Sequence, residues 1–479
     1  MFRAIALNTA ISFGGRIIAA ALGLFSLALT TRILGVEGFG LYSTALAWAY
    51  IFSFIADLGL YSLMVREVAR ASKEEEKRIA SHIFTLRLVS LSLFLGIGIM
   101  IALFSPWTLG LSTLAIILAS FQYLFLSISQ VLMGIFQKYL RLGAPAIADI
   151  SGRTVIAGAL LLLFYAGSTK PPYETILFIG ALGAGIASLL NIIPSRHLVS
   201  FRLVIDITYW KELLVHTFPI ALSIILTAFY FKLDTLFIAF FRNQEEVGLY
   251  NAAYKILENM IFFPAAFVGI LMPQFSQLAI ENKERFKSLF QGVFDILLIV
   301  TFPITFGVVF ESKAIMSAIG GNEFIAASKA LEVLAIGIFM IFFGSLFSQG
   351  LIALNEQKRL AWIYFFGAAF NIVANFVVVP LWGYVGAAVT TLFTEALVTI
   401  FMIRAIERTI SLKLHFGRAL PVILAVLAMS MVLYITTLPL LISIIAAAII
   451  YFTILWLSGG MTKEDINFVL QPSPKSHHV

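Results

Sequence analysis

The chain has 479 residues, of which 61% are hydrophobic and only 12% are charged, and its mean hydropathy is +1.00. Soluble domains carry about 25% charged residues, so this composition excludes a soluble globular protein and indicates one that lies mainly in a membrane. The absence of cysteine excludes disulfides, thiolate metal sites and a cysteine nucleophile. The net charge of +7 does not indicate a nucleic-acid partner, because the basic residues fall mostly in short loops between apolar segments.

Apolar segments long enough to cross a bilayer follow one another along nearly the whole chain. A helical crossing needs about 20 such residues. The first six are expected near residues 5–31, 41–65, 82–105, 108–137, 143–167 and 173–195. Six more are expected near 212–241, 247–275, 287–310, 326–354, 360–380 and 383–404, with a last hairpin near 418–437 and 439–458. The sequence therefore predicts an all-α polytopic membrane protein of about 14 transmembrane helices. The tight turn at Pro439 leaves a twelve-span count with an odd terminal segment open.

The basic residues orient these spans. Most of the 32 Lys and Arg residues fall in one set of loops, and the opposite loops hold only Arg32, Lys170, Arg242, Lys313 and Lys329. Cytoplasmic loops carry the excess of Lys and Arg. We therefore expect a multi-pass protein of the cytoplasmic membrane with both termini in the cytoplasm. The charged run 73–78 is expected to be a solvated connector between the second and third spans.

Two short motifs recur at matching places. Gly40-Leu41-Tyr42 and Gly248-Leu249-Tyr250 each follow the first span of a series of six. Gln137-Lys138 and Gln357-Lys358 give a second echo, each lying between the fourth and fifth spans of its series. The offsets are 208 and 220 residues. A duplicated six-helix unit inserted twice in the same orientation explains both.

The duplication predicts two parallel six-helix bundles, 1–205 and 206–410, followed by a two-helix hairpin, 411–458, and a cytoplasmic tail, 459–479. Parallel halves related by an axis along the membrane normal are typical of alternating-access transporters. The sequence contains no phosphate-binding loop, so an ion gradient or the substrate gradient is the expected energy source.

Three segments carry a resemblance to a known family. They are the run from Arg32 through Glu37 to Ser43, then Asp57-Leu-Gly, and the run from Gly321 to Leu331. Together they resemble the polysaccharide flippases of the multidrug/oligosaccharidyl-lipid/polysaccharide exporter superfamily. The resemblance implies two six-helix bundles in a V plus two extra helices. It also implies a lipid-linked oligosaccharide, on a polyprenyl or dolichyl diphosphate, as the cargo moved across the cytoplasmic membrane.

Charged residues inside the spans are the candidate functional residues, since each is costly in lipid. A cationic cavity for the diphosphate headgroup is expected from Arg16, Arg87, Arg153, Lys232 and Lys255. Arg87 is the weakest of these, because it lies close to the inner boundary and can extend toward it. Local pairing is the alternative for Arg153 with Asp149 and for Lys255 with Glu258, which lie at helical spacing.

Oxygen-bearing side chains in three later spans suit an alkali cation. They resemble the sodium site of the related lipid II flippases, and the matching residues are Asp234, Asn371, Asn375 and Thr391. Asn375 stands where those proteins have a carboxylate. The alternative is that the Asn and Thr residues hydrogen-bond between helices and that Asp234 pairs with Lys232 or water. Asp57 and Asp149 are further candidates for proton coupling.

The leading hypothesis is a flippase that functions as a monomer among membrane lipids, is not an enzyme and needs no cofactor beyond a coupling Na⁺ or H⁺. A multidrug or toxic-compound cation antiporter of the same architecture is the nearest rival, and the five intramembrane basic residues argue against it. A membrane glycan ligase or transferase is the third hypothesis. It would need a sizeable polar loop, and no loop exceeds about 20 residues.

Overall fold

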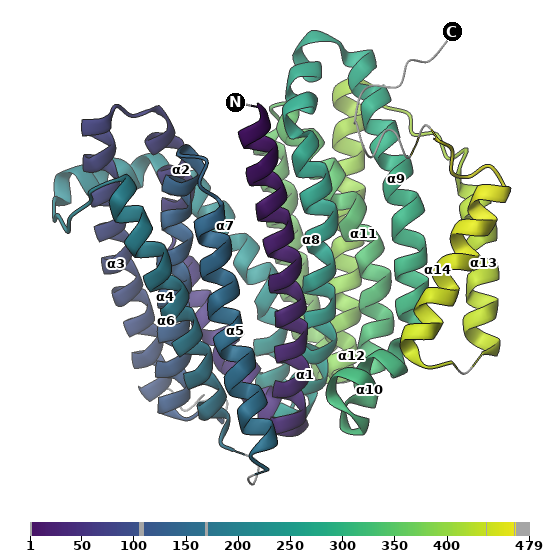
Figure 1. Ribbon diagram of the computed structural model, residues 1–479, viewed down its shortest axis with the longest axis horizontal. Coiled ribbons are helices and arrows are strands. Elements are labelled where there is room, and N and C mark those ends of the chain that lie inside the picture. The colour runs from purple at the N-terminus through teal and green to yellow at the C-terminus, as the bar shows by residue number, and fades with distance from the viewer. Residues whose placement is uncertain (1, 105–109, 168–170, 437, 464, 466–479) are drawn as a thin grey trace. The chain divides into compact units, whose positions relative to one another are not determined.

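The computed structural model describes residues 2–104, 110–167, 171–436, 438–463 and 465 (Figure 1). The part of the expected tail beyond residue 465 lies outside the described residues. Within them the chain is helical and contains no strand. The helices are α1 (Phe2–Ile55), α2 (Leu60–Arg70), α3 (Lys73–Phe104), α4 (Thr113–Lys138), α5 (Gly143–Tyr165), α6 (Tyr173–Leu198), α7 (Ile207–Phe241), α8 (Gln244–Glu281), α9 (Lys283–Phe310), α10 (Ser312–Gly320), the 3₁₀ helix η1 (Asn322–Ala327), α11 (Ser328–Ala353), α12 (Gln357–Ile410), α13 (Ala419–Ile435) and α14 (Leu440–Leu457).

All the predicted spans but the second correspond to one helix or to half of a kinked one within the described residues, which confirms the all-α polytopic fold. Ten helices of the described chain are long and apolar enough to cross a membrane. Two of these, α1 and α12, each join two predicted spans across a kink, at Gly35 (φ 69°) and Gly383 (φ 58°) respectively. Glycine occupies both kinks because a side chain is disfavoured at positive φ.

The second predicted span ends too late. It is expected to run to residue 65, but α1 ends at Ile55 and a separate helix, α2, starts at Leu60. Between them Leu58 (φ 48°) and Gly59 (φ 75°) are left-handed, which stops the helical ladder. The apolar pattern continues through this break, so hydropathy alone does not reveal it. The helices α10 and η1 are likewise absent from the prediction.

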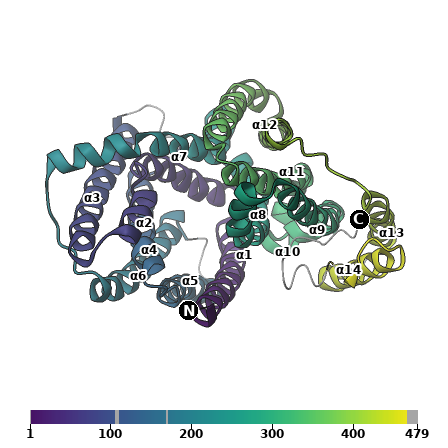
Figure 2. The same cartoon turned by 90° about the horizontal axis from the view of Figure 1, so that it is seen from above.

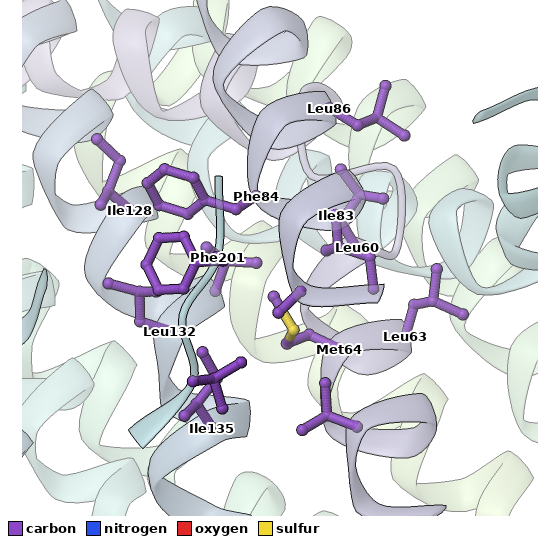
Figure 3. Packing of buried hydrophobic residues seen from close by; sticks show 14 of the residues in the cluster. Leu60, Leu63, Met64, Ile83, Phe84, Leu86, Ile128, Leu132, Ile135 and Phe201 are labelled. Carbon is purple, nitrogen blue, oxygen red and sulfur yellow. The ribbon is translucent and has the colours of Figure 1, made fainter. Parts of the chain in front are cut away.

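The chain divides into two compact units, Met1–Asn251 and Ala252–Val479. The first unit contains α1 to α7 and the beginning of α8. Helices α3, α4 and α6 run side by side in it, and α1 packs against α4 and α5 (Figure 1). One hydrophobic core of this unit lies where α2, α3 and α4 meet the segment after α6, and Figure 3 shows Met64, Phe84, Leu132 and Phe201 packed there.

A buried carboxylate ties three elements together at one end of the first unit. Glu76 is only 2% exposed, so the expectation that the whole run 73–78 is solvated is wrong at this residue. The Glu76 carboxylate pairs with Lys138 Nζ at 3.1 Å and accepts a hydrogen bond from Tyr139 Oη at 2.9 Å. Lys138 Nζ also donates to the Ala71 carbonyl. Partial burial and the hydrogen bond to Glu76 raise the pKa of Tyr139, which keeps its hydroxyl protonated as a donor.

The second unit is built on α9, α11 and α12. Helix α11 packs against both of the others, and α13 packs against α9. The terminal helices α13 and α14 lie side by side when the structure is seen from above (Figure 2). The buried Tyr451 of α14 donates its hydroxyl hydrogen to the Ile299 carbonyl of α9 at 2.7 Å. This hydrogen bond links the expected C-terminal hairpin to α9 within the second unit.

The two Gly-Leu-Tyr motifs contact one another in the first unit. A Cβ on Gly40 would overlap the carbonyl oxygen of Gln244, and a Cβ on Gly248 would overlap the carbonyl oxygen of Val36. Residues 36 and 244 are also 208 positions apart, so the contacts are reciprocal: each motif glycine faces the residue four positions before the other motif glycine. We call this pair of contacts the glycine crossing. Thr44 Oγ1 supports it with a 2.8 Å hydrogen bond to Gln244 Oε1.

The second sequence echo does not have matching positions in the helices. Gln137-Lys138 ends α4, whereas Gln357-Lys358 begins α12. The left-handed residues of the two turns, Leu140 (φ 51°) and Asn355 (φ 61°), correspond better. They are 215 residues apart. The turns after α4 and α11 therefore share a left-handed residue. The Gln-Lys dipeptides, in contrast, lie before this residue in one turn and after it in the other.

The glycine crossing predicts a strong contrast between two glycines of the same helix. Gly248→Ala should lower the thermal stability of the purified protein markedly, because the added methyl overlaps backbone that cannot swing away. Gly269→Ala, also in α8, meets nothing within 4 Å and should leave stability equal or slightly raised, since alanine favours a helix over glycine by about 1 kcal/mol. Unfolding followed by intrinsic fluorescence in detergent would test this. Equal melting temperatures for the two variants would contradict the crossing.

Candidate functional site

The helix break after α1 places a carboxylate inside the first unit. Asp57 occupies the break, and its backbone carbonyl accepts a hydrogen bond from Leu60 N at 2.8 Å. Its side chain pairs with Arg87 Nη1 of α3 at 2.5 Å, and Arg87 Nη2 also donates to Ser127 Oγ of α4. Asp57 is 4% exposed and Arg87 is 1% exposed. Arg87 is therefore a buried ion-pair partner and does not extend to the membrane boundary.

A second pair lies on α5 beside α1. Arg153 Nε donates to both carboxylate oxygens of Asp149, at 3.1 and 3.2 Å, which confirms the pairing expected from their spacing. A Cβ on Gly23 of α1 would lie 2.9 Å from Arg153 Nη1, so the guanidinium lies close against the backbone of α1 there. The side chains of Arg153 and Asp149 remain 42% and 49% exposed. Charges this exposed on an apolar helix need water or a polar ligand rather than lipid.

Arg16 lies two turns before Gly23 on α1 and is exposed. Its neighbour Gly15 abuts Ala146 of α5, where a Cβ would be only 2.9 Å from the Ala146 Cβ. Gly15 lies against Ala146 and Gly23 against Arg153, so residue numbers increase in the same direction along both helices. Helices α1 and α5 therefore run in the same direction here. Three of the predicted functional charges, Arg16, Asp149 and Arg153, lie on this pair of helices.

Asp234 is held by a tyrosine of the repeated motif. Tyr250 Oη donates to Asp234 Oδ2 at 2.7 Å, and both residues are buried. One helical step away, Thr235 Oγ1 donates to Asn251 Oδ1 at 3.1 Å. Lys232 is 8% exposed, and its ammonium lies 5.8 Å from the ring centroid of Tyr50. The tyrosine of the second Gly-Leu-Tyr motif thus positions a candidate coupling carboxylate.

In the second unit, Lys255 pairs with Glu258 at 2.6 Å, as its spacing suggests, and both side chains are about one-third exposed (39% and 30%). Local pairing is confirmed for this lysine as it is for Arg153. Neither contact excludes a role in binding, since both pairs keep exposed polar surface.

The predicted Asn and Thr ligands form a buried network across the two halves of α12. Asn375 Nδ2 donates to Asn371 Oδ1 at 3.1 Å, and Asn371 Nδ2 lies 3.5 Å from Thr394 Oγ1. Thr394 and Thr391 each donate their hydroxyls to carbonyls one turn back, those of Thr390 and Ala387. Of these contacts, only that between Asn371 and Thr394 joins the two helical halves in the way expected as the alternative to an ion site. Asp234 belongs to the other unit, and the four-residue sodium site stays a prediction.

Among the described residues, no group of three or more His, Asp and Glu side chains could hold a metal ion. Asp57 and Arg87 are both among the predicted functional residues, but their pairing is not predicted, since 30 residues separate them in the chain. Ser127 is absent from the prediction, and Tyr250 enters it only as part of a repeated motif. Helical spacing reveals contacts within one helix, whereas these partners come from different helices.

A family model described as "Polysaccharide biosynthesis protein" matches residues 5–279, more than half of the chain. The chain belongs to this polysaccharide biosynthesis protein family. A second model, MatE, matches residues 219–377. The relative named "Probable low-salt glycan biosynthesis flippase Agl15", from Haloferax volcanii, is 24% identical over 409 residues, which cover 85% of this chain and 84% of the relative.

Two solved structures share the fold. The lipid II flippase MurJ in an inward closed conformation has a TM-score of 0.76 at 17% identity, covering 95% of this chain and 98% of that one. A multidrug resistance transporter of the MATE family, in an inward-facing conformation, has a TM-score of 0.62 at 14% identity, with 83% and 98% covered. Both likenesses establish the architecture, and they include a flippase and a drug exporter alike.

Replacing the aspartate of each Asp–Arg pair by asparagine should lower the stability of the protein by different amounts. Asp57→Asn should destabilise the protein by about 3–5 kcal/mol, because it leaves the buried Arg87 guanidinium without its counter-charge. Asp149→Asn should cost about 0–1 kcal/mol, because water already reaches that pair. Thermal unfolding of the two variants in the same detergent would measure the difference. A larger loss for Asp149→Asn would show that Asp57 is not the structural carboxylate.

Proposed function

We propose that this protein is a flippase that moves a lipid-linked, anionic glycan precursor across the cytoplasmic membrane by alternating access. Membership of the polysaccharide biosynthesis family supports a substrate of this class. The relative from Haloferax volcanii carries a flippase name, and the fold is shared with a lipid II flippase. In this proposal the prenyl chain stays in the bilayer while the diphosphate and sugars pass through a polar path. The chain itself performs no catalytic step.

The observation that carries the proposal is the exposed charge on α1 and α5. Arg16 and the Asp149–Arg153 pair lie on apolar helices, yet they are accessible. Guanidinium groups bind phosphate oxygens through two parallel hydrogen bonds and keep their charge in a low dielectric. A path lined by them suits a diphosphate and disfavours the cationic drugs that an exporter of the same architecture would carry. Arg87, buried with Asp57, contributes to the shape of the path rather than to its net charge.

A cation gradient is the proposed driving force, with Asp234, Asn371, Asn375 and Thr391 as the sodium ligands. The buried carboxylate of Asp234 supports this, because a charge costly to bury needs a purpose or a partner. Proton coupling through Asp57 is the weaker proposal, since a proton there would have to break a buried ion pair. The exposed Arg66 and Arg70 of α2 support a cytoplasmic location for both termini. One chain contains both halves, so we propose that it functions as a monomer.

Transfer of a fluorescent polyprenyl-diphosphate oligosaccharide in proteoliposomes tests the function. Arg16→Ala should slow headgroup transfer at least tenfold, because it removes a cation from the path. Arg285→Ala, which removes an exposed arginine near the start of α9, should leave the rate unchanged. If the wild-type protein moved no lipid but released a cationic dye, the drug-exporter alternative would replace the flippase.

The coupling proposal makes a separate prediction at Tyr250. Asp234→Asn should abolish any dependence of transfer on an imposed sodium gradient. Tyr250→Phe should lower the sodium concentration for half-maximal transfer about fivefold, because Asp234 Oδ2 loses a competing donor worth about 1 kcal/mol. Tyr434→Phe changes a tyrosine that is 81% exposed and serves as the matched control. An identical sodium response in wild type and Asp234→Asn would exclude Asp234 as the coupling residue.

A further inference from the structure

A cavity of about 220 Å³ opens beside the helix break of the first unit. It is lined by Phe54, Asp57, Tyr61, Ser62, Arg87 and Gln130. Asp57 and Arg87 are buried, Tyr61 and Ser62 are half-buried, and Gln130 is exposed. The charged pair thus forms the base of the cavity, and Gln130 lies at its mouth. The volume equals that of about seven molecules of liquid water, which is the scale of a single sugar ring with its hydroxyl groups.

The cavity brings together side chains that can hydrogen-bond to a ligand. Arg87 and Asp57 pair at its base, and Arg87 Nε has no hydrogen-bond partner within the described chain. The hydroxyls of Tyr61 and Ser62 and the amide of Gln130 can each donate and accept. These three side chains are more exposed than the ion pair, so a ligand in the cavity reaches them first.

We propose that this cavity binds one sugar ring of the lipid-linked headgroup, and this rests on the proposed flippase function. Sugar hydroxyls both donate and accept, so they complement a carboxylate, a guanidinium, two hydroxyls and an amide within one small space. The Phe54 ring provides an apolar surface for the carbon–hydrogen face of the sugar. Specificity would follow from the polar base, since a site built to bond a hydroxyl discriminates strongly against a ligand that lacks it.

The charge of the cavity distinguishes the sugar from other ligands. Asp57 Oδ1 and Arg87 Nη1 lie 2.5 Å apart, and the two side chains neutralise each other's charge. A phosphate would have to displace Asp57 from the guanidinium, and a metal cation would have to displace Arg87 from the carboxylate. A neutral polyhydroxyl group does neither and can bond to both side chains while the pair stays intact. The accessible Arg16 and Arg153 therefore suit the diphosphate, because opening the exposed Arg153–Asp149 pair costs less than opening the buried Arg87–Asp57 pair, and the cavity suits the glycan.

Binding to the full chain in lipid nanodiscs tests the inference. The probes are four short-chain polyprenyl diphosphates: one without sugar and three carrying a hexose, an N-acetylhexosamine or a hexuronic acid. At least one glycosylated probe should bind more tightly than the bare diphosphate. Gln130→Ala should reduce this gain about three- to tenfold, the effect of one hydrogen bond, and leave affinity for the bare diphosphate unchanged. Ser62→Ala, at a second lining position, should act in the same direction.

Gln277→Ala is the matched control, because it removes an exposed glutamine of α8 that bonds only to Glu281 among the described residues. If all four probes bound equally, the sugar site would be excluded while the flippase proposal survived. A gain that neither Gln130→Ala nor Ser62→Ala reduced would place the sugar elsewhere and overturn the assignment. If no diphosphate bound at all, with or without sugar, both the proposed function and this site would fail.

Discussion

The cost of placing charge among apolar helices determines how this protein uses its few ionisable residues. Each of the predicted functional charges within the apolar helices has a counter-charge, a nearby polar or aromatic group or access to the surface. Asp57 and Arg87 solve the problem by complete burial as a pair, whereas Asp149 and Arg153 solve it by pairing while staying accessible. The buried pair holds helices together, whereas the accessible pair remains available to a substrate. The difference in exposure between the two pairs therefore separates a structural role from a binding role.

Much of the fold could be predicted from the sequence, because a bilayer reduces the problem to counting apolar segments of sufficient length. The predicted spans correspond to helices, and two pairs of spans are joined into the single kinked helices α1 and α12, at Gly35 and Gly383. The break at residues 56–59 could not be predicted in the same way. It depends on left-handed backbone at Leu58 and Gly59, and apolar residues continue on both sides of it.

The candidate site was predictable only where its partners share a helix. Asp149 with Arg153 and Lys255 with Glu258 follow from the helical repeat. The contacts of Arg87 with Asp57 and Ser127 join three different elements, and that of Asp234 with Tyr250 joins two. These contacts join different helices, so the spacing of residues along the chain does not predict them. The burial of Glu76 could not be predicted from composition either, because a charged run indicates exposure to solvent even where packing buries one of its residues.

The glycine crossing has the form of an interface between two identical subunits. When residue 36 meets 248 and residue 244 meets 40, each partner offers the same patch to the other, which is the defining property of a two-fold symmetric homodimer. If the two halves arose by the predicted duplication, the same contact could have joined two separate copies of a six-helix ancestor. The two tyrosines now have different partners, because Tyr250 donates to Asp234 and Tyr42, its counterpart, stacks on Phe39.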